Sequence, residues 1–176
     1  MCMRRFRTIV TVLIFAIIFM SGCGNGLEPE GKRPVLEFKS KFEVNSKKLS
    51  ITGNMMRFQG GEIEITVDSP ETLSGLKIKH RGSENLISKD GLTYKTDELI
   101  LPGGSDITAI LEAIDYMASN KDEAPFFTDS KEIAFIGKIS VDKFELRADK
   151  KTGFITEIKI GEQSTVKLSC QEKLEN

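Results

Sequence analysis

Cys23 is the residue of this sequence whose type and position point most directly to chemistry. It follows an uncharged apolar stretch, residues 8–20, and two small residues, Ser21 and Gly22; three arginines precede the stretch. A stretch of this length suits the core of a secretory signal, whereas a membrane-spanning helix needs about 20 apolar residues. Residues 1–22 are therefore predicted to be a signal peptide, and the thiol of Cys23 is predicted to be the site of a covalent modification.

Residues 20–23, Met-Ser-Gly-Cys, resemble the lipobox of bacterial lipoproteins. In that family the cysteine thiol is linked to diacylglycerol, whose acyl chains, palmitate among them, anchor the protein, and a peptidase cuts just before the cysteine. The resemblance implies an extracytoplasmic protein that is lipid-anchored to the cell membrane through Cys23. Met20 departs from the pattern, in which leucine is more usual. The alternative is a short membrane anchor in which Cys23 is incidental.

The two other cysteines offer neither a disulfide framework nor a metal-ligand pair. Cys2 lies within the predicted signal peptide, so Cys170 would have no partner within the chain. Cys170 is interpreted as an inert small residue near the end of a strand, and the alternative is an intermolecular disulfide. No cofactor and no metal site is predicted.

The charge of the chain excludes several classes of partner. Lys and Arg number 25 against 26 Asp and Glu, and three of the arginines lie in residues 1–22, so the net charge of the remainder is −4. An acidic chain without a basic patch favours neither binding to nucleic acid nor electrostatic attachment to anionic lipid. The expected partners are the membrane, through diacylglycerol on Cys23, and a lipid or an envelope protein.

A catalytic site is not indicated. His80 is the single histidine and lies in phase with Leu76 and Ile78, so it is expected either to pack or to lie at a rim at a strand end. Acidic residues alternate with lysines along the expected strands, which is typical of a solvated sheet face. No phosphate-binding loop, calcium-binding loop or zinc-ligand spacing occurs. The chain is therefore predicted not to be an enzyme and to have no catalytic residues.

The elements that must position these residues are mostly β-strands. From Val35 onward apolar and charged residues alternate with a period of two, as in an antiparallel sheet that meets water on one face. Turn-like segments separate the first strands, at residues 45–47, 59–61, 69–70 and 89–91. Sequential hairpins are the expected connection.

One helix is expected to interrupt the strands. Apolar residues recur at helical spacing, namely Ile107, Ile110, Leu111, Ile114 and Ala118, with Thr108, Glu112 and Asp115 on the other side. Ser105 or Asp106 is expected to cap the start of the helix, which should end near Asn120. The apolar stripe needs a surface, and the apolar face of the sheet is the only large one available.

Strands are expected again after the helix, at residues 133–139, 144–148, 154–160 and 165–168. The loop at residues 149–154, DKKTGF, would join two of them as a hairpin, with Gly153 able to take a positive φ.

This order of elements, with D-x-x-T-G at residues 149–153, resembles the LolA/LppX-like lipoprotein-carrier fold over most of residues 35–170. The resemblance implies the α+β class: a strongly curved antiparallel sheet, a half-barrel of hairpin-connected strands, with one main helix packed on its concave apolar face. The carriers usually open with an amphipathic helix that this chain lacks, so a smaller lid is expected. Anchored analogues are lipid-binding lipoproteins of this fold and small GerS-type clostridial lipoproteins, in which a related fold is a protein partner for a cell-wall amidase.

The predicted domain organisation is simple. Residues 1–22 are the signal peptide, 23–34 the lipidated cysteine and a flexible tether, 35–170 a single LolA/LppX-like domain, and 171–176 a C-terminal tail. The polar, glycine-rich tether has a reach of about 17 Å, which would hold the domain near the bilayer surface.

The periodicity leaves four apolar residues without an obvious inward position. Met55 and Met56 break the alternation after Gly53, as a β-bulge would, and either fill the core or line a cavity for an apolar ligand. Phe126 and Phe127 follow a proline in a charged loop, where an exposed ring would serve as a gate or a partner contact. These four residues are the candidate ligand or partner surface.

Two functions remain open at this stage. The preferred one is a non-enzymatic binding module, in which the curved sheet and the helix enclose a cavity for a lipid or another hydrophobic ligand. The alternative is an interaction protein whose interior is filled by its own side chains and which supports a cell-envelope enzyme or assembly. The space left between sheet and helix would separate the two.

Overall fold

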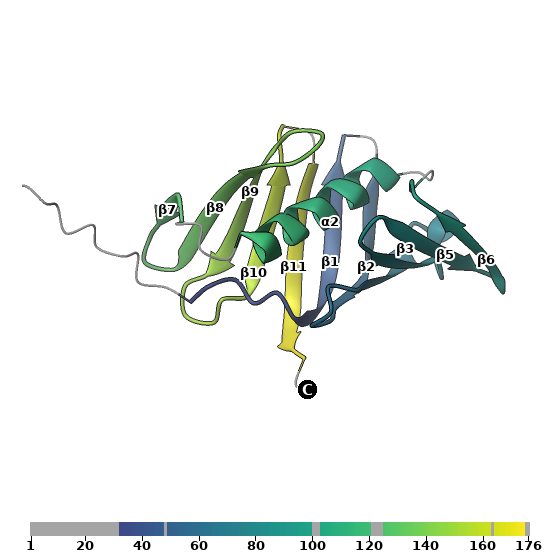
Figure 1. Ribbon diagram of the computed structural model, residues 1–176, viewed down its shortest axis with the longest axis horizontal. Helices are drawn as coiled ribbons and strands as arrows, with labels where there is room; N and C mark the ends of the chain where they lie inside the picture. The colour runs from purple at the N-terminus through teal and green to yellow at the C-terminus, as the bar shows by residue number, and fades with distance from the viewer. Residues whose placement is uncertain (1–31, 48, 100–102, 121–124, 163, 175–176) are drawn as a thin grey trace, which may run out of the picture.

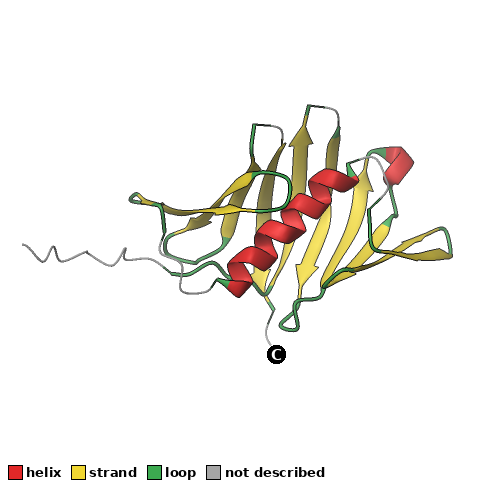
Figure 2. Ribbon diagram, turned by 45° about the horizontal axis from the view of Figure 1, so that its top comes forward, coloured by secondary structure: helices red, strands yellow, loops and turns green. Residues whose placement is uncertain are grey.

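The computed structural model describes residues 32–47, 49–99, 103–120, 125–162 and 164–174. Cys23 and the predicted signal peptide lie outside the described residues. Within the described part of the chain, eleven strands form one antiparallel sheet, and helix α2 lies across one face of it (Figures 1 and 2). The predicted α+β fold, a curved antiparallel sheet with one main helix on its apolar face, is confirmed.

The strands are β1 (Phe38–Ser46), β2 (Ser50–Arg57), β3 (Ile63–Ser69), β4 (Lys77–Arg81), β5 (Glu84–Lys89), β6 (Leu92–Thr96), β7 (Phe127–Thr128), β8 (Glu132–Lys138), β9 (Lys143–Asp149), β10 (Ile155–Ile160) and β11 (Ser164–Lys173). The helical elements are η1 (Glu71–Leu73), a short 3-10 turn, and α2 (Gly104–Ser119).

The strand order explains where the helix lies. The sheet runs β6-β5-β4-β3-β2-β1-β11-β10-β9-β8-β7, so sequential hairpins build each half and the β1–β11 ladder joins the halves at the centre. The first strand, β1, lies at this centre; the strands that follow it reach one edge at β6, and the later strands return from the other edge at β7. Because α2 connects β6 to β7, it must cross the sheet, and Figure 1 shows it doing so over the central strands.

The core lies between the inner face of the sheet and the apolar side of α2. Strand β1 alternates buried and exposed residues along its length, as the sequence pattern predicts. On the helix Ile107, Ile110, Leu111 and Ile114 are at most 1 % exposed. The predicted stripe differs at its end, where Met117 is buried and Ala118 is only half-buried.

The start of α2 corrects the predicted cap. The N-cap residue is Gly103, with φ of 74°, and no side-chain hydrogen bond caps the helix. A left-handed φ favours glycine at this position. Asp106 instead hydrogen-bonds the Oγ of Ser164 in β11, so its carboxylate fastens the first turn to the middle of the sheet.

The predicted bulge at Met55-Met56 is wrong. Strand β2 pairs with β1 without interruption from Ser50 to Arg57, and the irregularity in β2 lies between Thr52 and Gly53, against β3. The alternation therefore continues through Met55, which faces inward, and Met56, which faces outward. At the other end of the chain β11 continues to Lys173, so residues 171–173 belong to the sheet rather than to a tail.

The hairpin at residues 149–154 forms as predicted. One carboxylate oxygen of Asp149 accepts hydrogen bonds from the backbone N–H groups of Lys151 and Thr152, and Gly153 has φ of 78°. Residues 32–37, which we call the strap, run against this hairpin, with the N–H of Val35 donating to the carbonyl of Gly153 at 2.8 Å. A Cβ on Gly153 would lie 2.4 Å from the carbonyl oxygen of Arg33, so close packing of the strap also favours glycine. No described helix is both long and apolar enough to cross a membrane.

Candidate functional site

Two clefts of similar size flank helix α2. The first, which we call the arm cleft, has a volume of about 490 Å³ and lies between the polar side of α2, the β4–β5 hairpin and the β8–β9 turn. The second, the strap cleft, has a volume of about 520 Å³ and lies between the strap, the β2–β3 turn and the C-terminal end of α2. Small-molecule sites typically occupy about 300–1,000 Å³, so each cleft is large enough to hold a ligand.

A carboxylate on the helix lies between two cationic side chains of the sheet. Oδ1 of Asp115 is 3.3 Å from Nη2 of Arg57, at the end of β2, and Oδ2 is 3.7 Å from Nε2 of His80, in β4. The side chains of Arg57 and His80 are 7 % and 13 % exposed, whereas that of Asp115 is 38 % exposed. The carboxylate thus joins α2 to two different strands at the boundary between core and solvent.

The contacts of His80 determine how its ring is protonated. Its Nδ1 lies 2.9 Å from Oδ1 of Asn85, and the amide nitrogen of Asn85 donates to the carbonyl of Asp97 at 3.3 Å. Because an amide oxygen only accepts, Nδ1 is the donor, and the second proton of the charged ring lies on Nε2, toward Asp115. The interaction with Asp115 raises the pKa of His80, and burial opposes this more weakly.

The same contacts act on the carboxyl group. Burial alone would raise the pKa of Asp115, but the hydrogen bonds from His80 and Arg57 outweigh burial and hold its pKa below the usual range. Both shifts favour the charged forms, so His80 and Asp115 each stabilise the ionised state of the other.

Arg57 is the one basic residue on the inner face among the buried residues described. It continues the inward alternation of Gly53 and Met55 and is 6 % exposed. Nη1 donates to the carbonyl of Leu36 at 3.0 Å and Nη2 donates to Asp115. Nε is buried and has no acceptor among the described residues, which typically costs about 1–3 kcal/mol. The guanidinium, which also lines the strap cleft, therefore has donor capacity that its described neighbours leave unused.

The polar groups of the arm cleft are largely paired with one another. Glu112 accepts hydrogen bonds from the N–H and the hydroxyl of Ser140, at 3.0 Å and 2.8 Å, and so fastens α2 to the β8–β9 turn. His80 uses both ring nitrogens, toward Asn85 and Asp115, so neither nitrogen is available as a general base. This arrangement supports the position of the helix rather than proton transfer.

The predicted surface residues do not come together. Met55 is 1 % exposed and fills the core, which is the first of the two roles left open for it, while Met56 is half-buried on the opposite face. Phe126 is 75 % exposed and precedes β7, at the far edge of the sheet from β2. Phe127 lies in β7, and its side chain is outside the described residues. Cys170 is exposed in β11, with a φ of 52°, opposite an irregularity in its pairing with β1.

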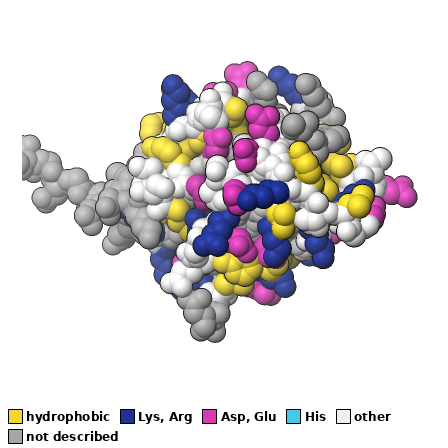
Figure 3. Space-filling view, turned by 45° about the vertical axis from the view of Figure 1, so that its right-hand side comes forward, with side chains coloured by type: hydrophobic (Ala, Val, Ile, Leu, Met, Phe, Trp, Pro, Cys, Tyr) yellow, Lys and Arg dark blue, Asp and Glu magenta, His cyan; other side chains and the backbone are white. Residues whose placement is uncertain are grey.

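The largest exposed apolar side chains in the described part of the chain include two on β6, the last strand at its edge of the sheet. Leu92 is 79 % exposed and Tyr94 is 68 % exposed. They alternate with Thr93 and Lys95, which face the other way, and Tyr94 lies opposite Ile87 of β5. Figure 3 shows hydrophobic side chains interspersed with charged ones on the side of the molecule that carries these strands.

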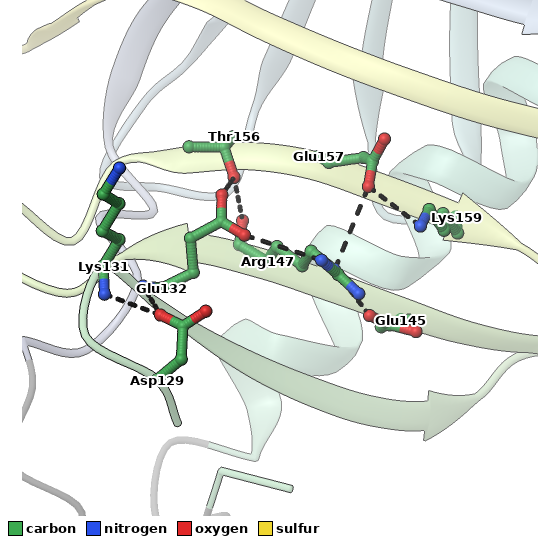
Figure 4. Close-up of polar contacts among 8 residues, drawn as sticks. All are labelled: Asp129, Lys131, Glu132, Glu145, Arg147, Thr156, Glu157 and Lys159. Carbon is green, nitrogen blue, oxygen red and sulfur yellow. Dashed lines mark hydrogen bonds and ion pairs between the residues drawn. The ribbon is translucent and has the colours of Figure 1, made fainter. Parts of the chain in front are cut away.

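The outer face of β8, β9 and β10 carries a network of charges (Figure 4). Arg147 lies among three glutamates, with Nε 2.6 Å from Glu145 and Nη1 3.6 Å from Glu132, and with Glu157 at 4.0 Å. These side chains are 19–35 % exposed, and surface ion pairs of this kind typically contribute about 0–1 kcal/mol. The network is the solvated sheet face that the alternation of acidic and basic residues predicts.

Comparison with known proteins shows a likeness of fold alone. No family model matches the chain, and no curated protein matches it. Among solved structures the chain is similar to the LolA superfamily protein NE2245 from Nitrosomonas europaea, with 9 % identity and a TM-score of 0.42, over 85 % of this chain and 90 % of that one. The topology and contacts of the chain itself define the fold and the two clefts.

Sequence reasoning did not identify Arg57 as part of a site. A signal was present, because Arg57 stands in phase with Ile51, Gly53 and Met55 on a strand whose other inward residues are apolar or small. Asp115 was correctly expected on the polar side of the helix, but its partners come from strands that are distant in the sequence. No pattern along one chain indicates that β2 and β4 bring a basic residue each to that point.

Proposed function

We propose that this protein is a membrane-anchored extracytoplasmic lipoprotein of the LolA/LppX-like kind, and that it is a non-enzymatic binding module for a lipid or another hydrophobic ligand. The observation that carries the proposal is the strap cleft, about 520 Å³ in volume, beside the end of α2. Its apolar wall is formed by Pro34 and Leu36 of the strap and by Met117 and Ala118 of the helix. Apolar walls with a few polar groups are typical of small-molecule sites.

The anchor is the second part of the proposal. The Ser21-Gly22-Cys23 junction after an uncharged apolar stretch supports modification of Cys23 by diacylglycerol. Two acyl chains attach a protein stably, whereas one chain gives only marginal binding. A short tether would then keep the cleft close to the membrane, from which a hydrophobic ligand could be taken.

A lipid that co-purifies with the protein would test the binding function. The chain from Lys32 onward would be purified without detergent and weighed by native mass spectrometry, with Ala118→Trp, in the strap cleft, and Ser119→Trp, in the arm cleft, as matched variants. We expect a bound lipid-sized mass that Ala118→Trp removes and Ser119→Trp retains. The absence of both a bound mass and saturable binding of a fluorescent fatty acid would contradict the proposal.

A second candidate function has its own support. Leu92 and Tyr94 are exposed on the terminal strand β6, and a terminal strand presents unpaired backbone groups that an extended segment of another protein can bind. This surface favours an interaction protein that supports a cell-envelope enzyme or assembly. The strap cleft and the exposed side chains of β6 can both occur on one molecule, so the two candidate functions are tested by variants that alter one surface at a time.

A further inference from the structure

We infer that the strap cleft binds a single-chain carboxylate amphiphile, a fatty acid in its ionised form, with the carboxylate on the guanidinium of Arg57. The alkyl chain would lie along the wall formed by Leu36, Met117 and Ala118. This inference names the ligand class of the proposed function and rests on that function.

The first support is the unused donor capacity of Arg57. A guanidinium has five N–H groups; one donates to the carbonyl of Leu36 and one to Asp115. Nε is buried without an acceptor among the described residues. A carboxylate matches a guanidinium in shape and accepts two hydrogen bonds from it, so this is the headgroup that the unused donors favour.

The second support is the charge of the cleft. Of its charged lining residues, Arg57 is the one that is buried. The Asp115 carboxylate that contacts Arg57 also contacts His80. A buried guanidinium in the wall of a cleft complements an anionic headgroup such as a carboxylate.

The third support is access to Arg57. Gly60 and Gly61, in the β2–β3 turn, line the cleft without side chains. A Cβ on Gly61 would lie 3.9 Å from Nη2 of Arg57, and a Cβ on Gly60 would have no neighbour within 4 Å. The two glycines therefore leave room in the cleft beside Nη2 of Arg57.

The arm cleft lacks these features. Its charged lining residues are Asp97, Glu112, Asp115, Lys138 and His80, so acidic groups are in excess even when His80 is charged. Glu112 is held by Ser140, and His80 is held by Asn85 and Asp115. An anionic ligand is therefore assigned to the strap cleft and not to the arm cleft.

Amphiphiles with the same chain and different headgroups test the inference. The full chain would be placed in nanodiscs, with empty nanodiscs as the blank, and the ¹³C-methyl signal of Met117 would report binding while that of Met56, on the outer face, serves as the reference. Decanoate, decanol and decyl phosphate would be titrated below their aggregation limits. We expect decanoate to bind about tenfold to hundredfold more tightly than decanol, as a charge-assisted hydrogen bond would give.

Variants show which residues cause the expected preference for decanoate over decanol. Arg57→Leu should reduce the affinity for decanoate to that for decanol. Ala118→Trp should remove the response of Met117 to both ligands, and Ser119→Trp should retain it, so the test stands even if Arg57→Leu fails to fold.

The remaining outcomes overturn the inference in distinguishable ways. Equal binding of decanoate and decanol at Met117 would overturn the carboxylate site and leave the binding function intact. Tighter binding of decyl phosphate than of decanoate would overturn the choice of headgroup. No response of Met117 to any of the three would overturn the inference and would count against the binding function as well.

Discussion

Nη2 of Arg57 lies 3.3 Å from Oδ1 of Asp115, and this contact joins the inner face of the sheet to helix α2 through the edge of an otherwise apolar core. The same guanidinium donates to the carbonyl of Leu36 in the strap. One basic side chain therefore connects three segments that are far apart in the sequence. Because Arg57 is buried, loss of either acceptor, the carbonyl of Leu36 or the carboxylate of Asp115, should lower the stability of the fold.

Replacing Asp115 with alanine should lower the free energy of unfolding by about 1–3 kcal/mol. The variant leaves a buried charged donor short of an acceptor, and the partial exposure of Asp115 keeps the loss below the 3–5 kcal/mol of a fully buried pair. Urea denaturation would measure it, with Asp68→Ala, which removes an exposed contact to Asn54, as a control expected to cost less than about 0.5 kcal/mol. Equal losses in the two variants would contradict a structural role for the network.

Stability should depend on pH through His80 and Asp115. The pKa of His80 is raised by Asp115, so its contribution is fully present below the unfolded value, about 6.5, and is lost as pH rises through the higher folded value. The pKa of Asp115 is lowered, so its contribution is present above the unfolded value, about 3.9, and is lost as pH falls through the folded value. The network should stabilise the fold most between about pH 4 and 6.5.

The His80→Gln variant isolates the contribution of His80 to the pH dependence of stability. The difference in unfolding free energy between wild type and variant should shrink as pH rises above about 6.5 and stay constant just below it. A difference that does not change over this range would show that His80 does not titrate between the folded and unfolded states.

Much of this fold could be predicted from the sequence, because the period-two and helical patterns describe one-sided burial directly. The alternation along β1 and the apolar stripe of α2 are examples, and the D-x-x-T-G turn lies where it was expected. The cap at Ser105 or Asp106 was wrong because Asp106 finds a better partner in Ser164, in a strand that follows almost sixty residues later. Capping motifs describe local hydrogen bonds and cannot include such a competitor.

The candidate site was predicted poorly for a related reason. Met55 and Met56 are adjacent apolar residues, a pattern that indicates a bulge, yet the uninterrupted β1–β2 register assigns one to each face. The clefts lie where the strap, the β2–β3 turn and the end of α2 meet, and their positions depend on the order of strands in the sheet. That order follows from pairing between β1 and β11, which no local pattern specifies.

Leu111 and Ile114 should be sites of large loss of stability. Each is at most 1 % exposed in the core between α2 and the sheet, so replacement by alanine should cost about 2–5 kcal/mol. Ser119→Ala, at the exposed end of the same helix, is the control and should change stability by less than about 0.5 kcal/mol. A loss below that limit at Leu111 or Ile114 would mean that the helix does not pack on the sheet in solution.

The anchor can be tested independently of the fold. Cys23→Ser removes the only proposed acyl acceptor, so it should abolish incorporation of a clickable fatty acid during growth and leave the precursor uncut. Cys170→Ser, which removes the exposed cysteine of β11, should leave labelling unchanged. Label that persists on the Cys23→Ser protein would remove the basis for the lipoprotein assignment.

The two candidate functions are distinguished by variants on two separate surfaces, strand β6 and the strap cleft. Leu92 and Tyr94 are 79 % and 68 % exposed on β6, so lysine at both positions should cost little stability and leave the affinity for a fluorescent fatty acid unchanged if the strap cleft is the binding site. Ala118→Trp should instead abolish that binding, because the indole would occupy the cleft beside Leu36.

If the protein is instead an interaction protein, the β6 variants should impair its function and the strap-cleft variant should not. Crosslinking in cell membranes should then yield a complex that the Leu92→Lys/Tyr94→Lys protein loses and the Ala118→Trp protein retains. Thr93→Lys adds a charge to the other face of the same strand and is the matched control. Equal loss of the complex in the double variant, the Ala118→Trp protein and the Thr93→Lys protein would mean that the loss is not specific to Leu92 and Tyr94. Loss confined to the double variant, together with no binding of fatty acid, would mean that the function belongs to strand β6 and not to the strap cleft.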